Sequence, residues 1–158
     1  MKILFVIDLQ KQFKDKFWEY EKCIDYIKSH KHEYFVVATL FKNFDDSMFE
    51  RHLNRSDSKD SEISDLEFTY DYCLDKTWYS ANKDWKLLDF IQKNCNWDDR
   101  YFVMGCESDA CVLATLFDLW NNNIDFKVLS EYIFTNNSKI SKDTILDFLK
   151  RNFWDCII

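Results

Sequence analysis

The sequence predicts an α/β protein, a three-layer α/β/α Rossmann-like fold with a mostly parallel six-stranded sheet. Short apolar runs alternate along the chain with segments of helical spacing, which is typical of parallel sheets covered by helices on both faces. The length of 158 residues suits one domain, which we place over residues 1–158. One Gly and no Pro occur, so no linker rich in these residues divides the chain.

Strands are expected where apolar residues run together without helical spacing. Residues 2–8 form a continuous apolar stretch that ends at Asp8. A stretch of this length is too short for a buried helix and is typical of a strand covered on both faces. The other expected strands, in chain order, are residues 34–40, 68–75, 100–104, 124–129 and 154–158.

Helices are expected where apolar residues recur every three or four positions, because this spacing places them on one helix face. Tyr20, Ile24 and Ile27 follow it in the first such segment. The expected helices are residues 17–29, 85–94, 109–122 and 142–151, with a short helical turn at 48–53. Since these helices alternate with the strands, most neighbouring strands are expected to be parallel.

Charge and composition limit the partners of the chain. The net charge is −7, from 21 basic and 28 acidic side chains, and this counts against binding to nucleic acid. No apolar run has the length of a membrane span, and the apolar N-terminus lacks the features of a signal peptide. The six cysteines form no C-x-x-C pair, as expected for buried thiols in a reducing compartment. We therefore expect a cytoplasmic protein with neither nucleic acid nor a membrane as partner.

Chemically active residues follow three of the expected strands. Asp8 ends the first, Lys76 follows the third, and residues 105–111 follow the fourth. Ligand sites of parallel sheets form at the carboxyl ends of the strands, so we expect these groups to lie close together. A carboxylate that ends an apolar strand is either partnered or functional, because burying it alone is costly. The alternatives are that Asp8 caps the next turn and that Lys76 is a solvated surface residue.

Residues 105–111 pass from a strand through a turn into a helix. Ser108 or Asp109 can cap that helix, which places Cys111 in its first turn. Helix N-terminal N–H groups favour a thiolate, so we expect a lowered thiol pKa, and the same groups can donate to an oxyanion. The alternative, which the local pattern by itself favours, is that Cys111 is a small core residue at the start of a helix. Gly105 is the one glycine of the chain, which indicates a backbone constraint at the head of this turn.

Four segments carry a resemblance to a known family. Residues 7–13 resemble the D-x-Q-x-x-F opening of the isochorismatase-like hydrolase superfamily, and residues 75–80 are similar to its K-x-x-(Y/F)-S segment. Residues 105–112 resemble its G-x-E-x-x-x-C-V nucleophile turn, and residues 43–53 match the N-x-x-x-S-x-F-x-R-x-L linker of some members. The motifs occur in the right order, span nearly the whole chain, and resemble the cysteine hydrolases related to nicotinamidase.

The resemblance implies a catalytic triad of Asp8, Lys76 and Cys111. In that family the carboxylate takes the thiol proton, the lysine stabilises charge, and the thiolate attacks the carbonyl of an amide or ureide. A thioester acyl-enzyme forms, and water then releases the acid. The family also has a cis peptide bond before the nucleophile, which falls between Cys106 and Glu107 here. The oxyanion donors are then the backbone N–H groups of Glu107 and Cys111.

The resemblance also bears on the substrate. If the motifs align, Phe13, Trp78 and Tyr79 lie near the site and form an apolar wall for a small planar substrate. The alternative is that these rings belong to the core of a very aromatic protein. True isochorismatases cleave a vinyl ether without a cysteine, so a cysteine here indicates cleavage of a C–N bond.

The chain departs from the metal-binding pattern of the nicotinamidase branch. That branch holds a metal through a D-x-H pair and a later His after the second strand. This chain has Asp45, Asp46 and His52 in that region and no D-x-H pair, so we expect no metal and no other cofactor.

The predicted function is therefore hydrolysis of a small amide or ureide. Relatives with this fold often form dimers or larger rings, so the resemblance also implies a homo-oligomer. One alternative is a catalytically silent member that keeps the fold for binding or assembly. Another is a redox protein that uses Cys106 and Cys111, although the geometry of this pair is poor for a disulfide.

Overall fold

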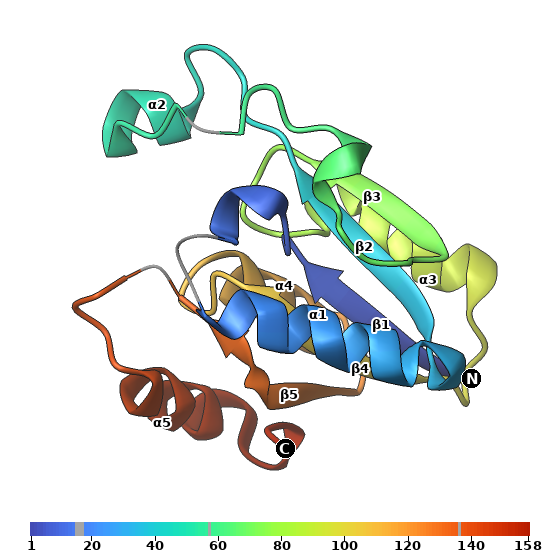
Figure 1. The fold of residues 1–158 in the computed structure, drawn as a ribbon. Coiled ribbons are helices and arrows are strands. Elements are labelled where there is room, and N and C mark those ends of the chain that lie inside the picture. Colours follow the sequence, from blue (N-terminus) through green and yellow to red (C-terminus); the bar gives the residue numbers. More distant parts are fainter. Residues whose placement is uncertain (15–17, 57, 136) are drawn as a thin grey trace.

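The computed structural model describes residues 1–14, 18–56, 58–135 and 137–158. In these residues a five-stranded parallel sheet, with strand order β3-β2-β1-β4-β5, lies between helices (Figure 1). The strands are β1 (Lys2–Ile7), β2 (Phe35–Phe41), β3 (Tyr72–Lys76), β4 (Arg100–Cys106) and β5 (Phe126–Phe134). The α-helices are α1 (Trp18–His30), α2 (Met48–Leu53), α3 (Lys86–Asn94), α4 (Cys111–Asn121) and α5 (Lys142–Phe153). Short 3-10 turns occupy Lys11–Phe13, Lys31–Glu33, Ile63–Asp65, Lys83–Trp85 and Trp154–Cys156. The predicted α/β class is confirmed.

The central strand β1 is apolar from Ile3 to Ile7 because both of its faces are buried there. Ile3, Phe5 and Ile7 pack into a cluster that includes residues of α3, α4 and α5. Leu4 and Val6 point to the opposite face and pack into a cluster that includes residues of α1. Side chains alternate between the faces along a strand, so a strand covered on both sides needs apolar residues at every position.

The predicted sixth strand at residues 154–158 is wrong. The chain turns at Trp154, which has φ 34°, and Trp154–Cys156 form a 3-10 turn directly after α5. Only Ile157 and Ile158 then run beside β5, where Ile157 makes an isolated bridge with Val128. The turn uses residues that would otherwise extend this pairing into a strand.

Several strand boundaries also differ from those expected. β4 continues to Cys106 rather than ending at residue 104, and β5 begins at Phe126 rather than at residue 124. β3 begins at Tyr72 rather than at residue 68, and β5 continues to Phe134 rather than ending at residue 129. The pairing of β4 with β5 is irregular between Val103 and Gly105, and this irregularity carries β5 past its expected end. Phe17, the first residue of the first expected helix, lies outside the described residues.

Gly105 is required by the contact between β4 and β1. It pairs with Ile7 and has φ +117°, a conformation that L side chains rarely adopt. A Cβ atom at this position would lie 2.1 Å from the carbonyl oxygen of Ile7. The expected backbone constraint is therefore present, and it places the turn after β4 directly beside the end of β1.

Among the described helices, none combines the length and the apolar character that a membrane span requires.

Candidate active site

Asp8 lies at the carboxyl end of β1 and is 3% exposed. Its backbone has φ 47°, and its N–H donates to the hydroxyl of Thr39 at 2.9 Å. The same hydroxyl donates to Asp8 Oδ1 at 2.6 Å. Thr39 belongs to the neighbouring strand β2, so two hydrogen bonds between adjacent strands hold the carboxylate in one orientation.

Lys76 is the last residue of β3 and is also 3% exposed. Its ammonium lies 2.6 Å from Asp8 Oδ2 and 3.4 Å from Cys111 Sγ. It also donates to the carbonyl oxygens of Trp78 at 2.7 Å and Tyr79 at 2.9 Å. Burial lowers the Lys76 pKa, but Asp8 and Cys111 raise it by more, so the net shift is upward. The buried side chain therefore stays an ammonium.

Cys111 is the first residue of α4 and so lies in its first turn, as expected, although the helix begins two residues later than expected. The expected cap by Ser108 or Asp109 is wrong, because the N-cap is Ala110, without a side-chain hydrogen bond. The Asp109 carboxylate accepts from the hydroxyl of Thr135 instead.

The expected lowering of the Cys111 thiol pKa is wrong. Burial raises the pKa of the thiol well above its usual value, and Asp8 raises it further, while Lys76 lowers it by less. Burial and the neighbouring Asp8 carboxylate thus outweigh the opposing effect of Lys76. The site holds a neutral thiol beside a carboxylate–ammonium pair.

The turn between β4 and α4 carries the nucleophile. Its Cys106–Glu107 peptide bond is cis. Cys106 is fully buried and donates its thiol to the backbone oxygen of Asp8 at 3.3 Å, and burial raises its pKa well above the usual value. Ser108 donates its N–H to the carbonyl of Phe134 at 2.8 Å. The turn is thereby attached to both β1 and β5.

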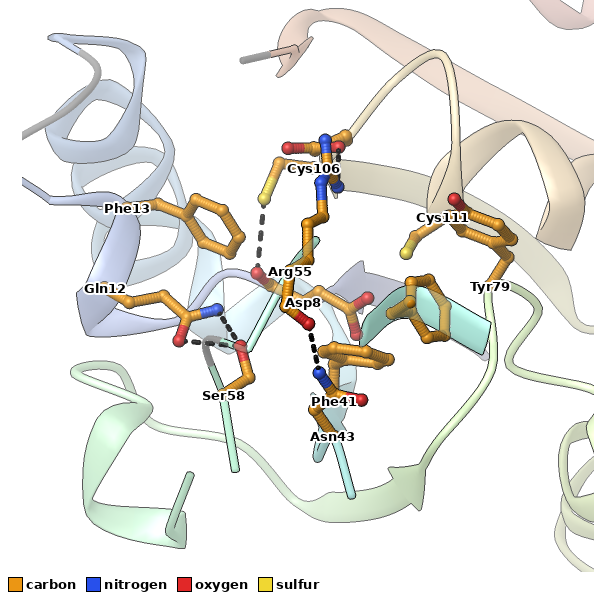
Figure 2. A pocket seen from close by; sticks show the side chains of 12 residues that line it. Asp8, Gln12, Phe13, Phe41, Asn43, Arg55, Ser58, Tyr79, Cys106 and Cys111 are labelled. Atoms are coloured by element: carbon orange, nitrogen blue, oxygen red, sulfur yellow. Dashed lines mark hydrogen bonds and ion pairs between the residues drawn. The ribbon is translucent and has the colours of Figure 1, made fainter. Parts of the chain in front are cut away.

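A cavity of about 60 Å³ opens at this edge of the sheet (Figure 2). Its described lining residues are Asp8, Gln12, Phe13, Phe41, Asn43, Phe49, Arg55, Ser58, Tyr79, Cys106, Glu107 and Cys111. A cavity needs roughly 10–15 Å³ by this measure to hold one water molecule, so the space suits a ligand of a few non-hydrogen atoms.

Of the three aromatic residues expected at the site, two line the cavity and one does not. Phe13 and Tyr79 line the cavity, but Trp78 is not among its described lining residues. The Trp78 ring packs instead near Phe44, at 6.4 Å between ring centroids, and beneath the ammonium of Lys83. Only the Trp78 backbone reaches the site, through its carbonyl contact with Lys76.

Several residues of the site were missed in the sequence. Thr39 orients Asp8 and carried a signal, because it is a polar residue near the end of an otherwise apolar strand. Phe41 and Ser58 line the cavity, as does Arg55, which is ion-paired with Glu107 at 3.2 Å. These three had no such signal, since only the tertiary structure brings Phe41, Arg55 and Ser58 to the end of β1.

The acidic residues after β2 do not form a metal site. The Asp45 carboxylate lies 2.6 Å from Lys59, and Asp46 lies 3.6 Å from Arg51. Across the described ranges, no group of three or more His, Cys, Asp or Glu side chains is placed to hold a metal ion. The residues in this region therefore do not fit the metal of the nicotinamidase branch.

The fold and the site together describe an α/β protein in which a buried acid and cation, Asp8 and Lys76, meet the partly buried thiol of Cys111 at one edge of a parallel sheet. The chain belongs to the isochorismatase family, since the model of the Isochorismatase domain matches residues 2–153. No curated protein sequence matches the chain significantly.

Solved structures share the fold. The pyrazinamidase of Pyrococcus horikoshii, solved in complex with zinc, is similar with a TM-score of 0.71 and 18% identity, over 99% of this chain and 96% of that one. The nicotinamidase PncA of Bacillus subtilis has a TM-score of 0.69 and 17% identity, over 96% of each chain. The N-carbamoylsarcosine amidase of Thermoplasma acidophilum has a TM-score of 0.65 and 18% identity, over 95% of this chain and 91% of that one.

Proposed function

We propose that this protein is a cysteine-dependent hydrolase that cleaves a C–N bond of a small amide or ureide. The observation that carries the proposal is the position of the Lys76 ammonium, 2.6 Å from Asp8 Oδ2 and 3.4 Å from Cys111 Sγ. A nucleophile, a base and a cation that steadies both are the groups that covalent amide hydrolysis needs. The family match and the amidases among the similar structures also support it.

In the first half of the reaction Asp8 takes the proton of the Cys111 thiol as Sγ attacks the substrate carbonyl. The raised pKa of this thiol means that proton transfer accompanies attack, rather than a standing thiolate waiting for substrate. The carbonyl oxygen becomes an oxyanion, which the N–H groups of Glu107 and Cys111 stabilise. Asp8 then returns the proton to the leaving nitrogen, the C–N bond breaks, and a thioester on Cys111 remains.

In the second half water attacks the thioester carbonyl while Asp8 accepts a proton from it. The C–S bond breaks, the acid leaves, and Cys111 recovers its proton from Asp8. Lys76 stays charged throughout and keeps Asp8 in place. The rings of Phe13 and Tyr79 form apolar walls, which favour a small planar substrate.

The first test is Cys111→Ala, assayed by ammonia release from a panel of amides and ureides. We expect turnover to fall by at least about 10³-fold, because no other group replaces the nucleophile. The matched control is Cys73→Ala, which removes a partly buried thiol from β3, outside the cavity lining. An active Cys111→Ala variant would exclude the mechanism.

A second test asks whether Asp8 accepts the proton of the Cys111 thiol. The Cys111 thiol is protonated at neutral pH, so it reacts only if a base takes its proton during attack, as Asp8 does in the proposed mechanism. With this base in place, alkylation by iodoacetamide at neutral pH, mapped by peptide mass spectrometry, is expected to be fastest at Cys111 in the native protein. Asp8→Asn is expected to suppress alkylation of Cys111 alone, since the neutral amide accepts no proton during attack. Equal rates at all six cysteines, together with a stable complex with another protein, would favour the catalytically silent binding or assembly protein.

The proposal includes a homo-oligomer in the cytoplasm. All six cysteines lie in described residues and are free thiols, which suits a reducing compartment. Trp18, Trp97 and Trp154 are 75%, 98% and 78% exposed, and tryptophan is one of the residue types enriched at protein interfaces. Light scattering coupled to size exclusion measures the mass, and a monomer would remove this part of the proposal.

A further inference from the structure

The loop that follows β3 holds the Lys76 ammonium through its backbone. Lys76 Nζ donates to the carbonyl oxygens of Trp78 at 2.7 Å and Tyr79 at 2.9 Å. Lys76 is 3% exposed, and a buried ammonium needs acceptors for its three N–H groups, so these two carbonyls determine where the charge lies. A shift of this loop therefore moves the ammonium relative to Cys111 Sγ, which is 3.4 Å away.

Thr115 joins this loop to the helix that carries the nucleophile. It lies one turn after Cys111 on α4 and is fully buried. Its hydroxyl donates to the carbonyl oxygen of Cys111 at 2.8 Å and accepts from the N–H of Ala81 at 3.2 Å. A threonine hydroxyl often bonds to the fourth preceding carbonyl of its helix. The bond from Ala81 is different, because it connects the helix to a segment that is distant in the sequence.

These bonds close a ring with the catalytic pair. The Lys76 ammonium binds the Tyr79 carbonyl, and the backbone continues from there to the N–H of Ala81. The Thr115 hydroxyl connects this N–H to the Cys111 carbonyl, and Cys111 Sγ returns to the ammonium of Lys76. Because the ring is closed, the distance between ammonium and thiol depends on the bond through Thr115.

A second contact attaches the same loop to α4 without being part of the ring. The Ser80 hydroxyl donates to the Asp118 carboxylate and accepts from the N–H of Asn82 at 2.9 Å. Asp118 lies about one turn after Thr115, so both contacts come from one face of the helix. The loop therefore stays attached when the Thr115 hydroxyl is removed, and it is shifted rather than released.

We propose that Thr115 is a positioning residue for the reaction, which sets the distance between the Lys76 ammonium and the Cys111 thiol through the backbone of residues 79–81. The inference rests on the proposed function, because the pair that it positions is the catalytic one. Lys76 opposes the raised pKa of the Cys111 thiol, and this effect falls with distance. Thr115 is not among the described residues that line the cavity, so it acts through its neighbours.

The test measures the rate at which iodoacetamide alkylates Cys111 at neutral pH, with Cys73 as the internal reference. Thr115→Val and Thr115→Ala both remove the hydroxyl. Each is expected to slow alkylation of Cys111 by about tenfold or more, because a misplacement of about 1 Å can cost roughly 10²-fold. Thr115→Ser keeps the hydroxyl and is expected to restore most of the native rate.

The matched control is Leu119→Val, a change at a fully buried residue two turns after Cys111 on α4. It is expected to lower the melting temperature, as the Thr115 variants do, but to leave alkylation of Cys111 unchanged. A merely structural role of Thr115 would give the same result as this control. Where the native protein hydrolyses an amide, Thr115→Val is expected to lower kcat and to leave KM nearly unchanged. Thermal melts establish that each variant is folded.

Two results would overturn the inference: alkylation of Cys111 at the native rate in Thr115→Val and Thr115→Ala, or a loss that Thr115→Ser does not restore. Ammonia release by the native protein separates this inference from the proposed function. Hydrolysis of an amide, with Cys111 equally reactive in all variants, would keep the hydrolase and reject the role of Thr115. Slower alkylation of Cys111 in Thr115→Val, without hydrolysis of any amide, would keep the positioning role and reject the hydrolase.

Discussion

Asp8 and Lys76 form an ion pair that is buried almost completely, with each residue 3% exposed. Removing two charges from water costs several kcal/mol per ion, and their attraction repays this only with good geometry and further hydrogen bonds. Thr39 supplies such a bond to Asp8, and the carbonyls of Trp78 and Tyr79 supply them to Lys76. Apolar residues would fill this space at a lower cost, so chemistry explains the pair better than stability does.

Gly105→Ala is expected to destabilise the fold by more than about 3 kcal/mol or to prevent folding, because the cost of a positive φ adds to a backbone collision. The new Cβ would lie 2.1 Å from the Ile7 carbonyl oxygen, and β1 cannot retreat without breaking its pairing with β4. Urea unfolding followed by circular dichroism measures the loss.

The matched control is Asn54→Ala. Asn54 ends α2 in the left-handed conformation, with φ 52°, and is exposed. Its replacement isolates the cost of a positive φ, which we expect to be about 1 kcal/mol. If the two substitutions cost the same, the contact with Ile7 would not be the reason for Gly105.

At the scale of elements, one side chain joins the segments that surround the cavity. Gln10 follows β1 and is fully buried. Its oxygen accepts from the N–H of Phe41 at 2.9 Å, and its nitrogen donates to the Phe41 carbonyl at 3.1 Å and to Ser61 at 3.0 Å. An amide that pairs with the backbone at the end of β2 continues the sheet where the strands diverge, and it positions the residues above the cavity.

Gln10→Leu is expected to cost about 2–4 kcal/mol, because it leaves buried backbone groups of Phe41 without their partner. Hydrogen exchange at the amide of Phe41 is expected to rise by about tenfold or more, since this amide donates to Gln10 in the native protein. Gln92→Leu, which changes an exposed glutamine on α3, is the control and is expected to alter neither quantity. Unchanged exchange at Phe41 would contradict the role given to Gln10.

At the scale of the whole molecule, buried thiols make the fold sensitive to alkaline pH. Burial raises the pKa of Cys23 from 9.0 to about 12 and that of Cys73 from 9.0 to about 11. Below pH 9 these thiols are protonated in both folded and unfolded chains, so their contribution to stability is fully present. Above pH 9 only the unfolded chain releases the protons, and the contribution is lost as the pH approaches the folded pKa.

The free energy of unfolding is therefore expected to fall between pH 9 and 11, by up to about 1.4 kcal/mol per pH unit for each such thiol. Urea unfolding at pH 8, 9 and 10 measures the slope. Cys23→Ala is expected to flatten the slope. The control is Ile24→Val, a change at the adjacent buried residue of α1, which is expected to lower stability at all three pH values and to leave the slope unchanged. A native slope of zero would show that these thiols ionise equally in both states.

The sequence predicted the sheet well where apolar runs are short and bounded. β1 and β2 match the expected strands within one residue at each end, because both are buried along most of their length and mostly apolar. The prediction failed at residues 154–158, where apolar residues cover the sheet edge from a 3-10 turn instead of joining it. A run of apolar residues does not by itself distinguish a strand from a partly exposed turn beside the sheet edge, since Trp154 and Ile158 are exposed here.

The sequence by itself determined the alternation of strands and helices, the need for glycine at position 105, and the placing of Asp8, Lys76 and Cys111 at strand ends. Each of these depends on the local pattern of apolar and polar residues or on a motif within a few positions. Only the tertiary structure decided that Thr39 orients Asp8, that Arg55 lines the cavity and that the Cys111 pKa rises. These features depend on which distant segments meet and on how much water they exclude, because hydrogen-bond geometry and desolvation are properties of the packed chain.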